Sequence, residues 1–206
     1  MEKQIHCPGA TGHPRGSHGC VMDFNQANMM PLLPNRALEE AAKGLPTARE
    51  VSSIERDDGE KWVYPSPMQF YNALVLKNKT NPDDAPYIPA AVMAHNQVNE
   101  RSWERVLEWE KRHFKTCPHP NLRRFVGKYD HTSPKSLINR YIFRMGKPFD
   151  RHDWYVNRCG REVRYVIDYY DDPKATDDIQ VYIDARPALD SPGSFFDRIR
   201  ALFSRN

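Results

Sequence analysis

His95 is the residue whose surroundings most clearly indicate chemistry in this chain. It lies in a segment, about residues 89–114, whose apolar residues recur with a helical period. With a turn of about 100° per residue and His95 at zero, Ala91 falls at about −40° and Val106 at about +20°. An imidazole in such an apolar stripe has two interpretations. It is either a core histidine satisfied by a backbone carbonyl or an axial ligand to a large apolar cofactor such as haem.

A second candidate is His152, which stands between two acids and beside Arg and Trp in the segment 150–154. A neighbouring carboxylate can orient an imidazole and hold its tautomer, which suits a metal ligand, an acid–base group or a buried network. An ordinary salt-bridge cluster in a loop has the same sequence pattern. The sequence therefore selects His152 without fixing its role.

The four cysteines are too widely spaced for CxxC pairs and too few for a disulfide scaffold, so the sequence predicts no disulfide. Cys7-Pro8 and Cys117-Pro118 are Cys-Pro pairs, a pattern associated with thiolate contacts to haem. Zinc is an alternative near the N-terminus, because imidazole and thiolate both suit that ion. Its ligands would come from His6, Cys7, His13, His18 and Cys20, whose spacing matches no compact zinc finger.

Other classes of function are disfavoured. The chain has no Gly-rich phosphate loop, GxSxG elbow or HExxH motif, which argues against nucleotide hydrolysis and acyl transfer. Its net charge is +3 with the two signs interspersed, so no nucleic-acid partner is expected. The longest apolar run, Tyr87 to Ala94, is far shorter than the ~18 residues of a spanning helix. Because Met1 to Gln4 lacks an apolar stretch, we expect no cleavable targeting segment.

The elements that position these residues indicate an α+β fold. The 206 residues are polar, with 39% apolar and 11% aromatic residues, and they suit one domain with a tail. Residues 1–33 mix His, Cys, Gly and Pro without an apolar period, which predicts a flexible tail. Residues 34–206 are predicted to form the domain.

Several helices and one late hairpin are predicted in that domain, and residues 52–59 are read as a loop. Antiparallel strands follow from β-rich patterns at 161–170 and 179–184. Helices are expected at 34–43, at 67 onward with Ser66 as cap, at about 89–114, at 133–143 and at 195–203. The long amphipathic helix carries His95, and the small antiparallel sheet lies near the C-terminus.

A series of short words gives a more specific indication than any single motif. The words are NMMP at 28–31, PN at 34–35, REVSSI at 49–54, WVYPS at 62–66, FYNA at 70–73, HNQ at 95–97, PFDRHDW at 148–154 and RYVIDYY at 164–170. In this order they closely resemble the holocytochrome c synthase family, the mitochondrial cytochrome c haem lyases. The resemblance is collinear from about residue 28 to the C-terminus.

The resemblance implies a lyase of the mitochondrial intermembrane space, peripherally attached to the inner membrane and without a spanning helix. Its substrates would be haem b and apocytochrome c, which docks through its N-terminal helix and its CxxCH segment. Two thioether bonds would form between the haem vinyl groups and the two substrate cysteines. Residues 34–206 would then be a single haem lyase domain.

The resemblance also implies roles for individual residues. His95 maps onto the axial ligand of the haem iron, and His152 onto a catalytic group that lines or orients the site. Glu100 matches an acidic position tied to haem binding or release, and Arg158 would meet a haem propionate, since guanidinium suits carboxylates. The aromatic residues expected near the haem are Trp62, Tyr64 and Trp154.

Two other functions remain open from the residues alone. The first is a haem chaperone or sensor that uses His95 and the Cys-Pro pairs but makes no covalent product. The second is a zinc-dependent interaction module built on the N-terminal tail. Both chaperone and lyase would take up haem, and only the lyase would leave haem on cytochrome c after denaturation.

Overall fold

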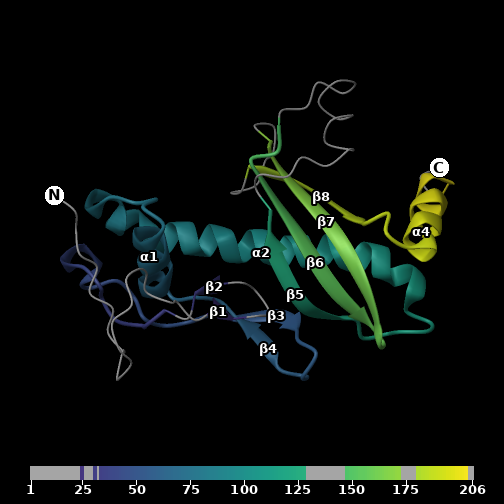
Figure 1. The fold of residues 1–206 in the computed structure, drawn as a ribbon, viewed down its shortest axis with the longest axis horizontal. Helices are drawn as coiled ribbons and strands as arrows, with labels where there is room; N and C mark the ends of the chain where they lie inside the picture. The colour runs from purple at the N-terminus through teal and green to yellow at the C-terminus, as the bar shows by residue number, and fades with distance from the viewer. Residues whose placement is uncertain (1–23, 26–29, 32, 129–146, 173–179, 204–206) are drawn as a thin grey trace, which may run out of the picture.

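The structure, a computed structural model, describes residues 24–25, 30–31, 33–128, 147–172 and 180–203 (Figure 1). They form an α+β fold, as predicted, in which helices come first and a four-stranded antiparallel sheet follows. One long helix runs along the molecule and contacts both a short helix near its start and the sheet beyond it (Figure 1). This long helix therefore links the two halves of the fold.

The first helix, α1 (Pro67–Leu76), begins where the sequence predicts. The Ser66 hydroxyl accepts a hydrogen bond from the Gln69 backbone N–H at 3.1 Å, and the Gln69 side chain accepts one from the Ser66 N–H at 3.2 Å. This reciprocal capping box satisfies two backbone donors that a helix start leaves without partners. Pro67 at the first helical position costs no hydrogen bond there.

The long helix is also confirmed. A 3-10 turn, η2 (Pro82–Tyr87), leads into α2 (Ile88–Glu110), and a second turn, η3 (Lys111–His113), extends it. Together they match the predicted span of about 89–114. No helix in the described ranges is both long enough and apolar enough to cross a membrane.

The sheet is a meander in which each strand pairs with the next one in the chain. Its order is β5 (Asn121–Gly127), β6 (Asp150–Arg158), β7 (Arg161–Asp171) and β8 (Val181–Pro187). The predicted hairpin is confirmed as β7 and β8, with Ile167 opposite Ala185. In the next pair, His152 of β6 lies opposite Ile167 of β7.

Strands β5 and β6 were not predicted, and the loop interpretation of the segment 150–154 is wrong. The reason lies in the pattern of β6, where charged residues occupy both faces. Asp150 and His152 share one face with the buried Trp154, while Arg151 and Asp153 occupy the other. Without the usual alternation of apolar and polar residues, a strand gives no period-two signal.

The predicted loop at 52–59 is confirmed at 57–59, which form a turn, and is wrong at Ser52 and Ser53, which lie in a strand. Its residues belong to a hairpin of β3 (Val51–Glu55) and β4 (Lys61–Val63), closed by a turn in which Gly59 has a φ of 82°. Glycine suits that position because it has no Cβ to oppose a positive φ. A further antiparallel pair joins β1 (Phe24–Asn25) and β2 (Met30–Pro31).

The predicted helix at 34–43 is reduced to a 3-10 turn, η1 (Glu40–Ala42). Tertiary hydrogen bonds take the carbonyls that a helix would use, since the Asn72 amide donates to the carbonyls of Pro34 and Arg36 at 3.1 and 2.9 Å. The last predicted helix is confirmed as α4 (Pro192–Phe203). The helix predicted at 133–143 lies outside the described residues.

Two clusters of buried side chains form the core. One fills the space between α2 and the sheet and includes Trp103, Val106, Trp154, Tyr165 and Ile167. The other joins η1, α1 and the start of α2 and includes Ala42, Met68, Tyr71, Ile88 and Val92. Because α2 contributes to both clusters, packing fixes the position of His95 relative to the sheet.

Candidate functional site

His95 lies on α2, and its ring is exposed. Its Nδ1 atom is 2.8 Å from the carbonyl oxygen of Ala91, one turn earlier. Its ring packs edge-on against Phe70 of α1, with centroids 5.0 Å apart and planes at 61°. The core-histidine interpretation is therefore wrong, because the imidazole is held at the surface between two helices.

The hydrogen bond to Ala91 fixes what the imidazole can do. A carbonyl oxygen only accepts hydrogen bonds, so Nδ1 must carry the proton in this arrangement. The neutral ring then has its lone pair on Nε2. Histidines that bind metals commonly donate their other N–H to a backbone carbonyl in this way. In this arrangement Nε2 is the ring nitrogen that can accept a metal ion or a proton.

His152 lies on β6 and is held by three neighbours. Its Nε2 atom is 3.2 Å from an Asp150 carboxylate oxygen. Its ring stacks over Phe125 of β5 at 6.4 Å and meets Tyr169 of β7 edge-on at 5.3 Å. With 22% of its side chain exposed, His152 is oriented by packing and still reachable from solvent.

Asp150 connects the two histidines electrostatically. Burial alone would raise the pKa of this carboxyl, but the hydrogen bond and charge of His152, the backbone N–H of Arg151 and the charge of His95 together lower it. The effect of His95 is the smallest of these contributions. Within the described residues, His95 contacts Ala91 and Phe70, and His152 contacts Asp150, Phe125 and Tyr169, so the two histidines are linked only by this charge effect on Asp150.

Aromatic side chains surround the start of β6. Phe149, just before β6, is 53% exposed and packs against Tyr169 at 6.3 Å. The Tyr169 hydroxyl lies 3.1 Å from the Ser102 hydroxyl, which donates to the Val98 carbonyl on α2. These contacts fasten α2 to the sheet next to His152. We name the set of His95, Phe70, Phe149, Asp150 and His152 the histidine site.

Sequence reasoning did not select Phe70, Phe149 or Asp150 as site residues. Asp150 had a usable signal, because residues two apart on a strand share a face. That signal required the segment to be recognised as a strand. Phe70 and Phe149 join the site only through tertiary packing, for which the sequence alone offers no sign.

Glu100 is engaged elsewhere on α2. Its carboxylate accepts hydrogen bonds from the Ser52 hydroxyl at 2.6 Å, the Ser53 backbone N–H at 3.1 Å, the Ser53 hydroxyl and the Tyr64 hydroxyl at 2.8 Å. Five residues after His95, it points about 140° away from it around the helix. The structure therefore joins Glu100 and Tyr64 to each other rather than to the histidine site.

These contacts change the acidity of both groups. Burial alone would raise the pKa of Glu100, but the hydrogen bonds from Ser52, Ser53 and Tyr64 outweigh it and lower the pKa. Burial raises the pKa of the Tyr64 phenol, and the neighbouring Glu100 raises it further. The resulting carboxylate–phenol pair fastens the β3–β4 hairpin to α2.

Trp62 and Trp154 belong to the core. The Trp62 indole N–H donates to the Leu122 carbonyl at 3.0 Å, and its ring meets Phe125 edge-on at 5.4 Å. Trp154 is 1% exposed and packs against Trp103 and Phe125. Since Phe125 also stacks on His152, both tryptophans support the histidine site from behind.

Arg158 lies at the other end of β6, six residues and about 20 Å along the strand from His152. It is 9% exposed and donates twice to the fully buried Glu110, each time at 2.7 Å. The Tyr165 hydroxyl donates to the same carboxylate at 2.5 Å, and Asp197 of α4 lies 3.5 Å from the guanidinium. The predicted contact of Arg158 with a propionate stays a prediction, and it would require this ion pair to open.

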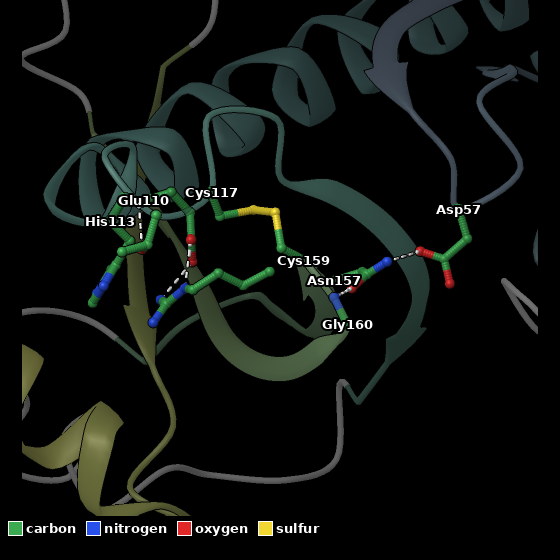
Figure 2. Close-up of a disulfide and its surroundings, with 9 residues drawn as sticks. Asp57, Glu110, His113, Cys117, Asn157, Cys159 and Gly160 are labelled. Carbon is green, nitrogen blue, oxygen red and sulfur yellow. Dashed lines mark hydrogen bonds and ion pairs between the residues drawn. A yellow bond between two sulfur atoms is a disulfide. The ribbon is translucent and has the colours of Figure 1, made fainter.

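A disulfide joins Cys117 to Cys159, which corrects the prediction that none would form. The predicted thiolate contact of Cys117 with haem is therefore also wrong, because its sulfur is bonded and buried. Figure 2 shows this bond beside Glu110 and His113. The disulfide links the chain after η3 to the turn between β6 and β7.

That turn is anchored on its other side as well. Asn157 accepts a hydrogen bond from the Gly160 N–H at 2.7 Å and donates to Asp57 of the β3–β4 turn at 3.0 Å (Figure 2). Cys159 and Gly160 both have positive φ values, 48° and 90°, as a two-residue hairpin turn requires. The end of the molecule that holds Arg158 is thus firmly cross-linked.

The described part of the chain contains no group of three or more His, Cys, Asp or Glu residues that could hold a metal ion. The residues of the zinc alternative lie outside the described ranges, so that alternative stays a prediction. A pocket of about 190 Å³ lies beside α2, smaller than the ~300–1,000 Å³ of typical ligand sites. It is lined by Pro46, Ala48, Glu50, Pro65, Pro67, Pro89, Val92, Met93 and Asn96.

Comparison with known proteins identifies the class. A family described as cytochrome c/c1 heme lyase matches residues 3–202. The chain belongs to this family, as the sequence words predicted, and it is a lyase. No solved structure matches it.

Curated relatives are similar over most of their length. The human holocytochrome c-type synthase is 43% identical over 191 residues, covering 89% of this chain and 70% of the human protein. A putative holocytochrome-c1 synthase of Schizosaccharomyces pombe is 44% identical over 160 residues, covering 73% of this chain and 72% of that protein. The holocytochrome-c synthase of Saccharomyces cerevisiae is 37% identical over 208 residues, with coverage of 88% and 77%.

Proposed function

We propose that this protein is a holocytochrome c synthase that attaches haem b covalently to apocytochrome c. The relatives named for this activity support the reaction class. The observation that carries the site assignment is the hydrogen bond from the His95 Nδ1–H to the Ala91 carbonyl, which leaves Nε2 as an exposed lone-pair donor. Haem is a substrate here and leaves with the product.

His95 holds the haem iron through Nε2 in this proposal. Phe70 packs against the imidazole and limits its rotation, which favours one orientation of the ligand. A single axial ligand from the protein leaves the opposite face of the haem open. The histidine of the substrate CxxCH segment takes that position, while the substrate N-terminal helix docks beside it.

The bond-forming step is the addition of a thiol across a vinyl group. Sulfur bonds to one vinyl carbon, the thiol proton passes to the other, and the C=C double bond becomes a single bond. This happens twice, once for each substrate cysteine, without net oxidation or reduction. Holding thiol and vinyl together supplies effective concentration, so the protein needs no nucleophile of its own.

His152 lines the site and helps place the reacting groups. Its contact with Asp150 favours one ring orientation, and because its Nδ1 atom is buried without a hydrogen-bond partner, it would act through Nε2, the nitrogen next to Asp150. Such a histidine can hold or transfer the thiol proton as the addition proceeds. Glu100 and Tyr64 influence haem binding or release indirectly, by fixing the β3–β4 hairpin on α2.

We place the protein in the mitochondrial intermembrane space, peripherally attached to the inner membrane, as the family resemblance implies. The disulfide between Cys117 and Cys159 supports a compartment outside the reducing cytosol, because disulfides persist in oxidising surroundings.

The test is co-expression with an apocytochrome c in a bacterium that lacks its own cytochrome c maturation system. Haem that stays on the cytochrome band in a denaturing gel, with wild type and not with His95→Ala, supports covalent attachment through this site. If the purified protein binds haem but gives no band with any of several c-type cytochromes, it is a non-covalent chaperone or sensor, and the proposed activity is wrong.

A further inference from the structure

Helix α4 presents its apolar side to solvent. Five apolar residues, at positions 195, 196, 199, 202 and 203, lie within an arc of about 120° around the helix. Leu202 is 72% exposed and Phe203 is 80% exposed, while Phe195 and Phe196 are at least half exposed. We name Phe195, Phe196, Ile199, Leu202 and Phe203 the α4 apolar face.

The polar side of the same helix is buried, and specific contacts hold it there. Asp197 is 5% exposed and lies 2.9 Å from the His113 Nε2 atom and 3.5 Å from the Arg158 guanidinium. Ser194 is buried against the Ser191 hydroxyl, and Arg198 donates to the Pro187 carbonyl at 2.7 Å. These polar contacts fix the rotation of α4, so the outward direction of the apolar face is built into the fold.

The surroundings of α4 are basic. Segment η3 and the residues after it, which contact α4 through His113, carry the exposed side chains of Lys111, Arg112 and Lys115. No acidic side chain in the described ranges forms an ion pair with these three. The Arg161 guanidinium lies beside Gly193 at the start of α4. On α4 itself, Arg198 and Arg200 lie about 40° beyond the two ends of the apolar arc, so positive charge borders the apolar face.

A helix with Phe and Leu on one side and Lys or Arg around it is suited to the surface of a bilayer, where apolar side chains enter the acyl boundary. Basic groups beside it are attracted by anionic headgroups. A second copy of this chain is a poor fit, because two basic borders would repel each other. The helix lies at one extremity of the molecule, where a flat surface can reach it (Figure 1).

We propose that the α4 apolar face inserts into the surface of a membrane that contains anionic phospholipids, with Lys111, Arg112 and Lys115 contacting the headgroups. The inference rests on the proposed membrane location and adds the part of the molecule that makes the contact. His95 and His113 are 18 residues apart, about 27 Å along the helix axis. Attachment through α4 therefore leaves the histidine site accessible to a soluble apocytochrome.

The test measures binding of the purified full chain to phosphatidylcholine vesicles with and without phosphatidylglycerol. Wild type is expected to bind the anionic vesicles, and the double variant Phe195→Ser with Leu202→Ser to bind at least about tenfold more weakly, since two large apolar side chains are lost. Lys111→Gln with Lys115→Gln should reduce binding and its dependence on salt. Tyr87→Ser, at a residue 73% exposed on η2, is the matched control and should bind as wild type does.

The same variants are tested for haem attachment in solution, which should be unchanged because none touches the histidine site. Absence of vesicle binding by wild type, or equal binding by the double variant, overturns the inference. A dimer that the double variant abolishes would assign the face to a second copy instead. Loss of haem attachment with vesicle binding intact would assign it to a protein partner. If wild type binds vesicles but attaches no haem, the proposed activity fails and the membrane surface stands.

Discussion

The His152 Nε2 atom lies 3.2 Å from a carboxylate oxygen of Asp150, and the two side chains share one face of β6. The same carboxyl has its pKa lowered, because the hydrogen bond from His152 and the charges of His152 and His95 outweigh the cost of burial. Asp150 is thus in direct contact with the histidine of the sheet, and the histidine of the long helix adds the smallest part of the effect on its pKa.

Removing the charge of Asp150 should weaken product formation while leaving haem bound. Asp150→Asn keeps the shape of the side chain but no longer anchors His152, and loss of such an orienting partner typically costs about 10–100-fold. Yield of haem-stained cytochrome and haem content of the purified lyase would be measured together. Asp83→Asn, an exposed carboxylate on η2, serves as control. Undiminished yield from Asp150→Asn would show that this contact is irrelevant to the reaction.

Glu100 should contribute a pH-dependent part of the stability. Its pKa is lowered in the folded protein from an ordinary value of 4.5, so the unfolded chain binds more protons in the window between the two values. Its contribution is therefore complete above about pH 4.5 and is lost as the pH falls through the lowered pKa.

Glu100→Gln is expected to lose about 2 kcal/mol of the free energy of unfolding near neutral pH, as hydrogen bonds to a charged group typically contribute. The difference from wild type should shrink on acidification, measured by denaturant unfolding across the acid range. Glu104→Gln, which changes an exposed acid on the same helix, should show neither effect. A difference that stays constant with pH would contradict the assignment.

Removing one member of the buried pair of Arg158 and Glu110 should cost more stability than removing both. Arg158→Leu leaves a fully buried carboxylate without its partner and should cost about 3–5 kcal/mol. The double variant with Glu110→Leu removes both charges and should recover much of that loss. Thermal or denaturant unfolding of wild type and the two variants tests this expectation, and a double variant that is no more stable than Arg158→Leu would contradict it.

The disulfide should stabilise the domain by about 4 kcal/mol, from the chain entropy of a loop with a sequence separation of 42 residues. Replacing Cys117 and Cys159 together by Ala should lower the unfolding midpoint, and a reductant should lower that of wild type to a similar extent. The double variant should not respond to the reductant. Equal midpoints for oxidised wild type and double variant would indicate that the bond has no stabilising role.

The sequence was informative wherever a local signal existed. The capping residues around Ser66 predicted the start of α1, and the apolar period predicted α2. Alternation at 179–184 and the β-rich run at 161–170 predicted the last hairpin. Such features depend on neighbours in the chain, which a sequence displays directly.

The features that were missed depend on contacts between distant residues. Strand β6 carries charges on both faces because the face that holds Asp153 is buried in a network of ion pairs. In this network Asp153 contacts Lys128 and Arg164. The disulfide needs Cys117 and Cys159 brought together by the sheet. His95 was expected on an apolar face of the helix, but its ring is exposed. The same helix reaches the sheet only further along, where Ser102, two turns later, contacts Tyr169.

The haem content of purified His95→Ala tests the central claim most directly. Wild type, His95→Ala and the control His119→Ala, which changes another exposed histidine, would be purified after identical expression and assayed for haem and for helix content. We predict that His95→Ala loses most of its haem with the fold retained, while His119→Ala keeps it. Full haem occupancy in a folded His95→Ala protein would contradict the assignment of His95 as the axial ligand.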